Sequence, residues 1–362
     1  MTNCEQFMAI ALDLAVRGRG EVEPNPMVGA VVVRDGRIIG RGWHRKFGQA
    51  HAEINAIADA GYDVAGADVY VTLEPCSHYG KTPPCADALI TAGVKRVFVS
   101  VADPDERVAG RGIQKLRDAG IEVVVGVSEQ AGRELLKEYL KLRTVHRPWV
   151  ICKWAQTLDG RIDLGRHSEH RWISCEASRR DVHILRSFCD GILVGVETVV
   201  KDNPMLTNRS GEGRQPVRVV LDGSLRIPDN CKLVKTAREF STLVVTQGIF
   251  GDSQKAAALR DAGVEVITLP ADAGRINLPS LLDVLGRRDW TRLLVEGGAT
   301  VHGAFIDSRL ADEAQAYIAP FNAPAEYDLP LFPADNLPPC YQLHSEQQIG
   351  VDTFKTYRLV SC

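Results

Sequence analysis

The first half of the chain alternates between helical and strand-like spacing of apolar residues. Apolar positions between residues 7 and 14 recur at intervals of three and four, which predicts an opening amphipathic helix. Two apolar runs, 28–33 and 37–43, then flank Asp35-Gly36, a dipeptide that suits a tight hairpin turn. We therefore expect these two runs to form adjacent antiparallel strands.

The alternation continues as far as residue 142 and predicts an α/β layer with a mostly parallel sheet. The expected strands are 69–73, 96–101 and 121–125, and the expected helices are 51–60, 86–91, 112–119 and 129–142. Pro148 lacks a backbone N–H and restricts Arg147 to extended geometry. We place the domain boundary there, which gives domains 1–146 and 147–362.

A second alternating series follows this boundary and predicts another α/β domain. Its expected strands are 150–154, 192–196, 217–221, 243–246, 264–269 and 293–296, and its expected helices are 177–187, 255–262, 281–287 and 299–308. The two halves show no repeat relationship.

Composition agrees with this two-domain interpretation. The chain has 362 residues, and at about 150 residues per domain this length corresponds to roughly two domains. Lys and Arg number 43 against 46 Asp and Glu, a net charge of −3, which disfavours nucleic acid as a partner. No apolar run approaches the ~18 residues that cross a bilayer, so no membrane partner is expected. The nine scattered cysteines indicate reduced thiols and a cytoplasmic protein.

The strongest chemical signal combines His51-Ala-Glu53 with Cys76 and Cys85. One imidazole and two thiolates suit Zn²⁺ and leave a fourth tetrahedral position for water, as in a catalytic site. Cys85 follows two prolines that suit a helix start, so the helix dipole would favour its thiolate. Glu53 can lie beside the metal without binding it, and can move a proton from that water to the substrate.

This pattern is the H-x-E, P-C and later C signature of zinc nucleobase deaminases. Two other interpretations fit the same residues: a structural zinc site closed by His78 as the fourth ligand, and a metal-free core. A closed structural site leaves Glu53 beside the metal without a role.

Longer motifs in both halves resemble one family, the bifunctional riboflavin-biosynthesis deaminase/reductases. The motifs are Pro24 to Val33, Gly42-Trp-His44, His51-Ala-Glu53, Thr72 to His78, Gly80 to Cys85, Lys153, Leu158 to Arg161, Trp172 to Ser174, Leu193 to Gly195 with Thr198, Asp202 to Pro204, Leu206-Thr207, Gln215 to Asp222, and Val295 to Gly298. The resemblance covers nearly the whole chain.

The resemblance implies a cytidine-deaminase-like first domain and a dihydrofolate-reductase-like second domain. It also implies two consecutive reactions on one small phosphorylated pyrimidine. In the first, 2,5-diamino-6-ribosylamino-4(3H)-pyrimidinone 5′-phosphate loses an amino group by zinc-dependent hydrolysis. In the second, NADPH reduces the ribosyl side chain, which gives 5-amino-6-ribitylaminouracil 5′-phosphate. We expect the enzyme to be a homo-oligomer.

Motif matching also implies residue roles in the deaminase half. Glu53 is the expected catalytic residue, and His51, Cys76 and Cys85 are the expected zinc ligands. The expected substrate contacts are Asn25, His44, His78, Lys81 and Asp103. Asp105 stands where the family pattern has asparagine, and its carboxylate can accept but cannot donate, so it is a weaker contact candidate.

The reductase half has no G-x-G-x-x-G after a strand, so a Rossmann fingerprint is absent. Instead Gly297-Gly298 lies between a predicted strand and helix, a turn that can present backbone N–H groups to a pyrophosphate. The resemblance assigns the NADPH cofactor to Lys153, Gln156, Trp172, Thr198, Asp202, Gly298, Ala299, Thr300, Val301, His302, Gly303 and Ala304. It assigns the reductase substrate to His170, Arg186, Leu206, Arg209 and Glu296.

Arg186 and Arg209 are suited to the 5′-phosphate because guanidinium binds phosphate oxygens in a fork. His170 and Gln156 depart from the small residues of the family pattern. Two other functions were considered: a deaminase of tRNA or free nucleobases with a binding module as its second half, and a non-catalytic zinc scaffold. The acidic charge balance argues against the first, and Glu53 beside an open metal site argues against the second.

Overall fold

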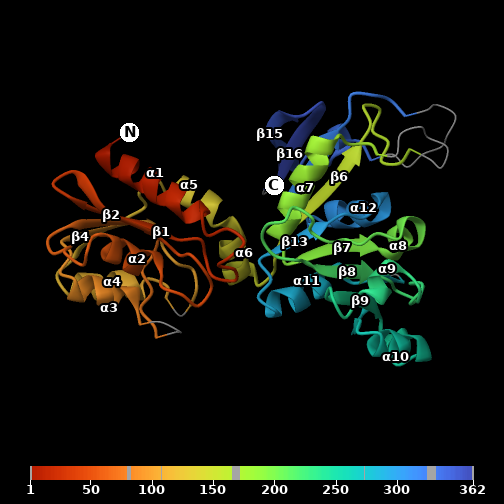
Figure 1. Cartoon of the computed structure of the whole chain (residues 1–362), viewed down its shortest axis with the longest axis horizontal. Helices are drawn as coiled ribbons and strands as arrows, with labels where there is room; N and C mark the ends of the chain where they lie inside the picture. Colours follow the sequence, from red (N-terminus) through yellow and green to blue (C-terminus); the bar gives the residue numbers. More distant parts are fainter. Residues whose placement is uncertain are drawn as a thin grey trace. The chain divides into compact units, whose positions relative to one another are not determined.

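The computed structural model describes residues 2–79, 83–106, 108–164, 172–272, 274–323 and 332–360. Its internal contacts divide the chain into an N-terminal unit, Met1–His146, and a C-terminal unit, Arg147–Cys362. Figure 1 draws the first unit in red to yellow and the second in green to blue. The predicted α/β class is confirmed in both units.

The N-terminal unit is built on one five-stranded sheet of order β2-β1-β3-β4-β5. The predicted hairpin is confirmed: β1 pairs antiparallel with β2, and Asp35 and Gly36 both have positive φ at the turn. β1 is also antiparallel to β3, whereas β3, β4 and β5 are parallel to one another. The strand bounds are β1 Gly29–Arg34, β2 Arg37–Trp43, β3 Asp68–Leu73, β4 Arg96–Val101 and β5 Glu122–Val125.

Helices cover both faces of this sheet because its strands bury alternate residues on opposite sides. Val31 and Val33 pack against one face with α1, and Ala30 and Val32 pack against the other with α2. Figure 1 shows α1 and α5 on one face and α2, α3 and α4 on the other. The helix bounds are α1 Asn3–Val16, α2 Ala52–Asp59, α3 Cys85–Thr91, α4 Arg111–Asp118, α5 Glu129–Leu135 and α6 Lys137–Val145.

The prediction of one helix over 129–142 is wrong, because the segment forms two helices, α5 and α6, that meet at Leu136. Leu136 has φ −99° and ψ 6° and is 1% exposed. It packs with Tyr139 against Leu73 and Val101, the last residues of two sheet strands. The break thus directs α6 toward the carboxyl ends of β3 and β4.

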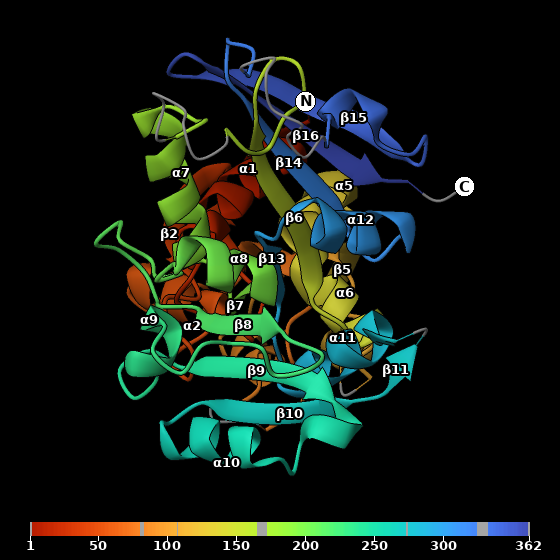
Figure 2. The same cartoon turned by 90° about the vertical axis from the view of Figure 1, so that its right-hand side faces the viewer.

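The C-terminal unit contains a nine-stranded sheet of order β10-β9-β8-β7-β13-β6-β14-β16-β15. Strands β6 to β10, β13 and β14 are parallel, and β16 pairs antiparallel with both β14 and β15. Figure 2 shows β7, β8, β9 and β10 side by side. The bounds are β6 Trp149–Gln156, β7 Gly191–Gly195, β8 Val217–Leu221, β9 Thr242–Gln247, β10 Glu265–Leu269, β13 Arg292–Val295, β14 Glu313–Ile318, β15 Tyr341–Ile349 and β16 Asp352–Leu359.

Both faces of the parallel part of this sheet are buried, as is usual for parallel strands covered by helices. In β6, Val150 and Cys152 join one apolar cluster, whereas Ile151 joins the other. The helices are α7 Glu176–Ser187, α8 Val196–Asp202, α9 Lys232–Lys235, α10 Gln254–Asp261, α11 Leu278–Arg287 and α12 Ala299–Asp307, and a short hairpin pairs β11 Ala271–Asp272 with β12 Arg275–Ile276. Among the described residues, no helix is both long and apolar enough to cross a membrane.

Candidate functional site

The carboxyl ends of β3 and β4 meet at one edge of the N-terminal sheet, because Leu73 pairs in register with Val101. The Glu74 carboxylate after β3 accepts the backbone N–H of Asp103 at 3.2 Å and those of Gly110 at 3.1 Å and Gly112 at 2.9 Å. Glu74 is only 4% exposed. This buried carboxylate therefore fixes the loop that follows β4 beside the loop that carries Cys76.

Two glycines bring α2 to the same edge. A Cβ atom on Gly40 or Gly42 of β2 would lie 2.3 Å from the backbone oxygen of Ala56 or Ala52, respectively. Their lack of side chains therefore allows α2 to pack directly on β2. His51 occupies the N-cap position of α2 but makes no capping hydrogen bond, and Glu53 in the first turn is 3% exposed.

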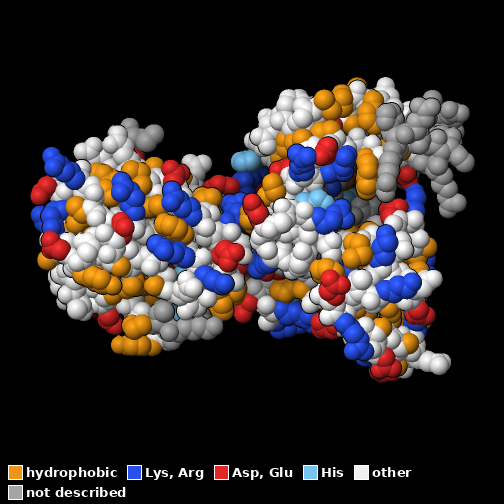
Figure 3. Space-filling view, in the orientation of Figure 1, with side chains coloured by type: hydrophobic (Ala, Val, Ile, Leu, Met, Phe, Trp, Pro, Cys, Tyr) orange, Lys and Arg blue, Asp and Glu red, His pale blue; other side chains and the backbone are white. Residues whose placement is uncertain are grey.

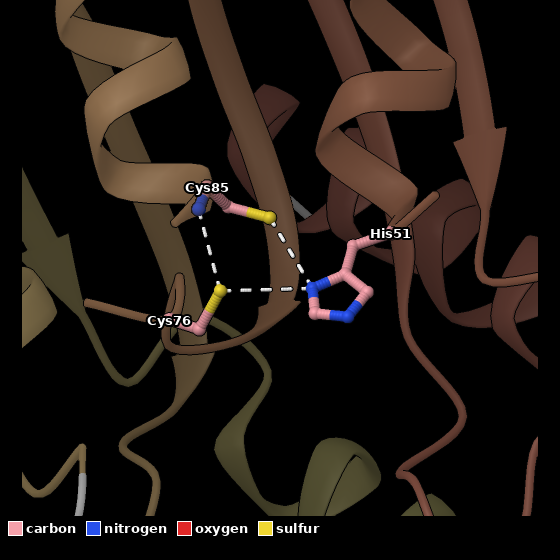
Figure 4. Close-up of side chains that lie close together, drawn as sticks. All are labelled: His51, Cys76 and Cys85. Atoms are coloured by element: carbon pink, nitrogen blue, oxygen red, sulfur yellow. Dashed lines mark hydrogen bonds between the residues drawn. The ribbon is translucent and has the colours of Figure 1, made fainter. Parts of the chain in front are cut away.

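His51, Cys76 and Cys85 point toward one another, from the start of α2, the loop after β3 and the start of α3 (Figure 4). Their ligand atoms all lie within 4.8 Å of one another. His51 Nδ1 is 3.6 Å from Cys76 Sγ and 3.4 Å from Cys85 Sγ. A tetrahedral zinc ion with Zn–S of ~2.3 Å and Zn–N of ~2.05 Å places such atoms about 3.6 Å apart. The three side chains therefore fit a zinc ion.

The start of α3 contacts the sulfur of Cys76. The first residue of α3 donates its backbone N–H to Cys76 Sγ at 3.3 Å. Hydrogen bonds from Cys85 and His51 lower the pKa of Cys76 to about 4, whereas the hydrogen bond with Cys76 and burial raise the pKa of Cys85. The first backbone N–H of α3 thus stabilises the thiolate of Cys76, because it points back toward the preceding loop. A zinc ion requires both sulfurs as thiolates.

Glu53 lies beside these thiols, and its carboxyl interacts with Cys85. Burial, together with the negative charge of Cys76, raises the pKa of Glu53 to about 7. A group with a pKa near neutrality can both accept and return a proton.

A pocket opens beside this cluster and is lined by His51, Cys76 and Glu53. Four of the five predicted substrate contacts line it: Asn25, His44, His78 and Asp103. The fifth, Lys81, lies outside the described residues. The Nδ1 atom of His78 is buried and has no hydrogen-bond partner among the described residues.

His44 is held in one tautomer by its two neighbours. Its Nδ1 lies 3.1 Å from the oxygen of Ala50, and its Nε2 lies 3.2 Å from the Asn25 side-chain nitrogen. Nδ1 therefore carries the hydrogen and Nε2 accepts from the amide. Burial lowers the pKa of His44, and its ring contacts that of His51 edge-on at 5.1 Å between centroids.

The pocket also contains side chains that the sequence analysis missed or discounted. Tyr139 of α6 donates its hydroxyl to both carboxylate oxygens of Asp103 at 3.1 Å. Arg143, one turn further along α6, has its Nε 3.5 Å from Asp105 Oδ2. Burial raises the pKa of Asp103 to about 6 although Tyr139 opposes the shift. The helical spacing of Tyr139 and Arg143 was the available signal, but nothing in the sequence linked α6 to the loop after β4.

The C-terminal unit contains a buried ion network at the carboxyl ends of its strands. Arg186 of α7 binds Glu296, which follows β13, through Nε at 3.0 Å and through the second nitrogen at 2.6 Å. A third nitrogen donates to the backbone oxygen of Thr207 at 3.1 Å. Burial alone would raise the pKa of Glu296, but Arg186 and Lys153 outweigh it and lower the value to about 2. Burial also disfavours the charged form of Lys153, which lowers the pKa of its amine.

The N-terminus of α12 fits the phosphate groups of a dinucleotide. Gly298 is its N-cap, no side chain caps it among the described residues, and a Cβ atom built on Gly298 would meet nothing within 4 Å. A Cβ on Gly297 would instead lie 2.6 Å from Val301. Open space over an uncapped helix start suits a pyrophosphate, and ligands of parallel α/β sheets bind outside the carboxyl ends of the strands.

The remaining predicted residues of the C-terminal unit occupy varied environments. His302 is fully buried against the rings of Trp154 and Phe332, so its side chain faces the core. The Gln156 side-chain oxygen accepts from Trp154 at 2.9 Å and from the backbone of Ala334 at 2.8 Å.

The other predicted positions differ in exposure. The Leu206 side chain is buried at a residue with φ 52°. Trp172 is 54% exposed and lies under the Arg179 guanidinium. Thr198 is half-buried and Asp202 exposed on α8, whereas His170 lies outside the described residues.

Comparison with known proteins assigns both units. The family model described as "Cytidine and deoxycytidylate deaminase zinc-binding region" matches residues 1–101, and the model described as "RibD C-terminal domain" matches residues 148–337. The riboflavin biosynthesis protein RibD of Aquifex aeolicus is 43% identical over 317 residues, covering 87% of this chain and 86% of the relative. The RibD protein of Escherichia coli is 39% identical over 329 residues, covering 87% of each chain.

Two solved structures resemble this chain over nearly its whole length. Acinetobacter baumannii RibD has a TM-score of 0.86 at 34% identity, with 99% of both chains covered. The Thermotoga maritima structure, described as a diaminohydroxyphosphoribosylaminopyrimidine deaminase/5-amino-6-(5-phosphoribosylamino)uracil reductase, has a TM-score of 0.86 at 36% identity, again with 99% coverage.

Fold, metal geometry and comparisons together define a zinc-dependent deaminase joined to a reductase. The chain belongs to the RibD family of bifunctional riboflavin-biosynthesis enzymes. It is therefore both a hydrolase and an oxidoreductase, and its cofactors are zinc and NADPH.

Proposed function

We propose that the chain deaminates 2,5-diamino-6-ribosylamino-4(3H)-pyrimidinone 5′-phosphate with residues 1–146. Residues 147–362 then reduce the ribosyl side chain of the product. The observation that carries the proposal is the His51, Cys76 and Cys85 arrangement with Glu53 buried beside it. When bound there, zinc supplies Lewis-acid activation of a water molecule.

In the deamination step Glu53 holds and moves the proton. Its carboxylate takes one proton from the attacking water and gives it to the ring nitrogen. It then takes the second proton from the new hydroxyl group and gives it to the amine, which leaves as ammonia as the carbonyl forms. Asn25, His44, His78 and Asp103 orient the pyrimidine and its ribose within the pocket. Lys81 is proposed as a further contact from its motif position.

In the reduction step Glu296 and Arg186 form the polar wall of the substrate site. Lys153, the proposed cofactor contact, helps to keep Glu296 ionised by lowering its pKa. NADPH supplies the hydride when bound. The Gly298 to Ala304 backbone, with Thr198 and Asp202, holds the cofactor phosphates and ribose, while Gln156 and Trp172 flank it. Arg209, with Leu206 and His170, completes the side that receives the phosphorylated substrate.

We also propose a cytoplasmic homo-oligomer. The eight cysteines of the described residues are free thiols, which supports a reducing compartment. Strand β15 lies at a sheet edge with residues 342–348 all exposed, and such edges pair readily with other chains. Light scattering of the purified protein tests the assembly, and a monomeric mass would contradict it.

The central experiment follows ammonia release and NADPH absorbance in one reaction with the pyrimidine phosphate. We expect one ammonia released and one NADPH oxidised per substrate molecule. Deamination without NADPH oxidation would contradict the reductase assignment, and NADPH oxidation without ammonia would contradict the proposed order of steps.

A further inference from the structure

His183 of α7 contacts Arg209 through both of its ring nitrogens. The backbone N–H of Arg209 points at His183 Nδ1 at 3.3 Å, and the Arg209 guanidinium lies 3.0 Å from His183 Nε2. Neither sequence motifs nor the proposed substrate contacts include this histidine. It lies one helical turn before Arg186, on the same helix.

The two contacts cannot both be hydrogen bonds. A backbone N–H and a guanidinium only donate, whereas a neutral imidazole has one N–H and one acceptor nitrogen. If Nδ1 accepts from the backbone, Nε2–H faces the guanidinium, and the opposite tautomer leaves Nδ1–H facing the backbone N–H. Protonation of the ring puts an N–H on both nitrogens, so each ring nitrogen then faces another donor. In every protonation state at least one donor therefore faces another donor.

The surroundings of His183 are predominantly cationic. Arg186 on its own helix, Arg209 on the loop after α8, and Lys153 on β6 all disfavour its charged form, and only Glu296 favours it. Burial is the largest cause, and together these effects lower the pKa of His183 to about 4. The ring is thus neutral near pH 7 and keeps one N–H to donate. Figure 3 shows Lys and Arg side chains over α7 on the face drawn, with Asp and Glu side chains among them.

An anionic acceptor between His183 and Arg209 gives both donors a partner. Arg186 is already occupied in part, since it binds Glu296 and the Thr207 oxygen. Arg209, by contrast, is exposed, and its guanidinium faces the imidazole.

We propose that His183 is an anion-binding residue of the reductase site and that, together with Arg209, it binds the phosphate monoester of the substrate. This inference rests on the proposed function, in which Arg209 lies on the phosphate side of the substrate. The Nε2–H group and the guanidinium donate to phosphate oxygens, while Nδ1 stays anchored to the Arg209 backbone. The contact between two donors is relieved only when the anion is bound, so it favours the phosphorylated substrate over its dephosphorylated form.

The test uses the full-length enzyme, the deaminated pyrimidine phosphate as substrate and inorganic phosphate as a competing probe. For His183→Leu we expect the KM of the NADPH-dependent step and the inhibition constant of inorganic phosphate to rise about tenfold, the size of a lost hydrogen bond to a charged group. The kcat should stay within twofold. His183→Gln, which keeps a donor and an acceptor, should recover most of the loss.

Arg180→Gln is the matched control, because Arg180 lies on the same helix with its side chain 77% exposed and paired with Glu176. It should leave KM and phosphate inhibition unchanged. With the dephosphorylated substrate, His183→Leu and the native enzyme should have equal kcat/KM.

Two results would overturn the inference. In the first, inorganic phosphate inhibits His183→Leu as strongly as the native enzyme but no longer inhibits Arg209→Gln. The proposed phosphate site would then stand, but His183 would not be part of it. The other is an equal loss of kcat/KM with phosphorylated and dephosphorylated substrates, which assigns His183 a structural role. If inorganic phosphate inhibits Arg209→Gln as strongly as the native enzyme, the proposed phosphate site itself is wrong.

Discussion

The two candidate sites are assembled in different ways. In the N-terminal unit, His51 and Cys85 are 34 positions apart and meet through a thiol–imidazole contact. In the C-terminal unit, Arg186 and Glu296 are 110 positions apart and meet through an ion pair. A metal selects rare donor types at fixed spacing, whereas an ion pair uses common residues brought together by the sheet. A sequence signature is therefore strong for the first site and weak for the second.

Because each unit has its own candidate site, the two activities should be separable. Removing a metal ligand should have the largest effect on one activity alone. Cys85→Ser should lose zinc and abolish ammonia release, because a serine hydroxyl is a poor zinc ligand at neutral pH. NADPH oxidation with the deaminated substrate should stay within twofold. Metal analysis, an ammonia assay and NADPH absorbance measure the three quantities.

Cys4→Ser is the matched control for this variant, because Cys4 lies in the same unit and its sulfur accepts a hydrogen bond from the Tyr70 hydroxyl at 3.6 Å. It should keep both zinc and ammonia release. Loss of NADPH oxidation in Cys85→Ser would show that the two sites depend on one another.

Glu53→Gln sharpens the comparison within the metal site, because it removes the proton carrier and keeps the ligands. Ammonia release should fall about 10²- to 10⁴-fold, the usual contribution of a positioned acid or base. Zinc content should equal that of the native enzyme. A fully active Glu53→Gln variant would exclude Glu53 from proton transfer.

Arg186→Ala is the corresponding change in the C-terminal unit. It leaves the buried Glu296 carboxylate without its principal partner, and breaking a buried pair of this kind costs about 3–5 kcal/mol. We expect kcat/KM of the NADPH-dependent step to fall at least ~10²-fold while ammonia release is retained.

Arg186→Lys, which keeps the charge but loses the paired hydrogen bonds, should be intermediate. Joint loss of both activities in Arg186→Ala, together with a lowered melting temperature, would indicate unfolding instead of a local defect.

Tyr139→Phe should have the smallest effect. Losing the hydroxyl that donates to Asp103 should raise the deaminase KM about two- to tenfold, the range of an ordinary hydrogen bond. Asp103 has a raised pKa of about 6, so its carboxylate is protonated and accepts less well as the pH falls through that value. The native KM should therefore rise below about pH 6.

The hydrogen bond from Tyr139 lowers the pKa of Asp103, so Tyr139→Phe should move the midpoint of this rise to higher pH. A KM profile from pH 5 to 8 measures both effects. An unshifted midpoint would show that Asp103 does not govern the profile.

Local sequence predicted much of the fold because most elements repeat their apolar residues at the period of one helix or strand. Strands 37–43, 96–101 and 217–221 have the predicted bounds. Strands β14, β15 and β16 were not predicted. Residues 342–348 of β15 are exposed on both faces, whereas β14 is buried on both faces, so neither strand shows a period-two pattern of apolar and polar residues. The break at Leu136 was also missed, because it is caused by packing against β3 and β4.

The sequence by itself determined the α/β class, the donor set His51, Cys76 and Cys85, and the place of Glu53 beside it, since spacing and residue type carry that information. Only the tertiary structure decided that Tyr139 contacts Asp103 and that His183 faces Arg209. These contacts join elements that are distant in sequence, and their geometry depends on how helices pack across strand ends. No local pattern encodes that packing, because it arises from the whole buried core.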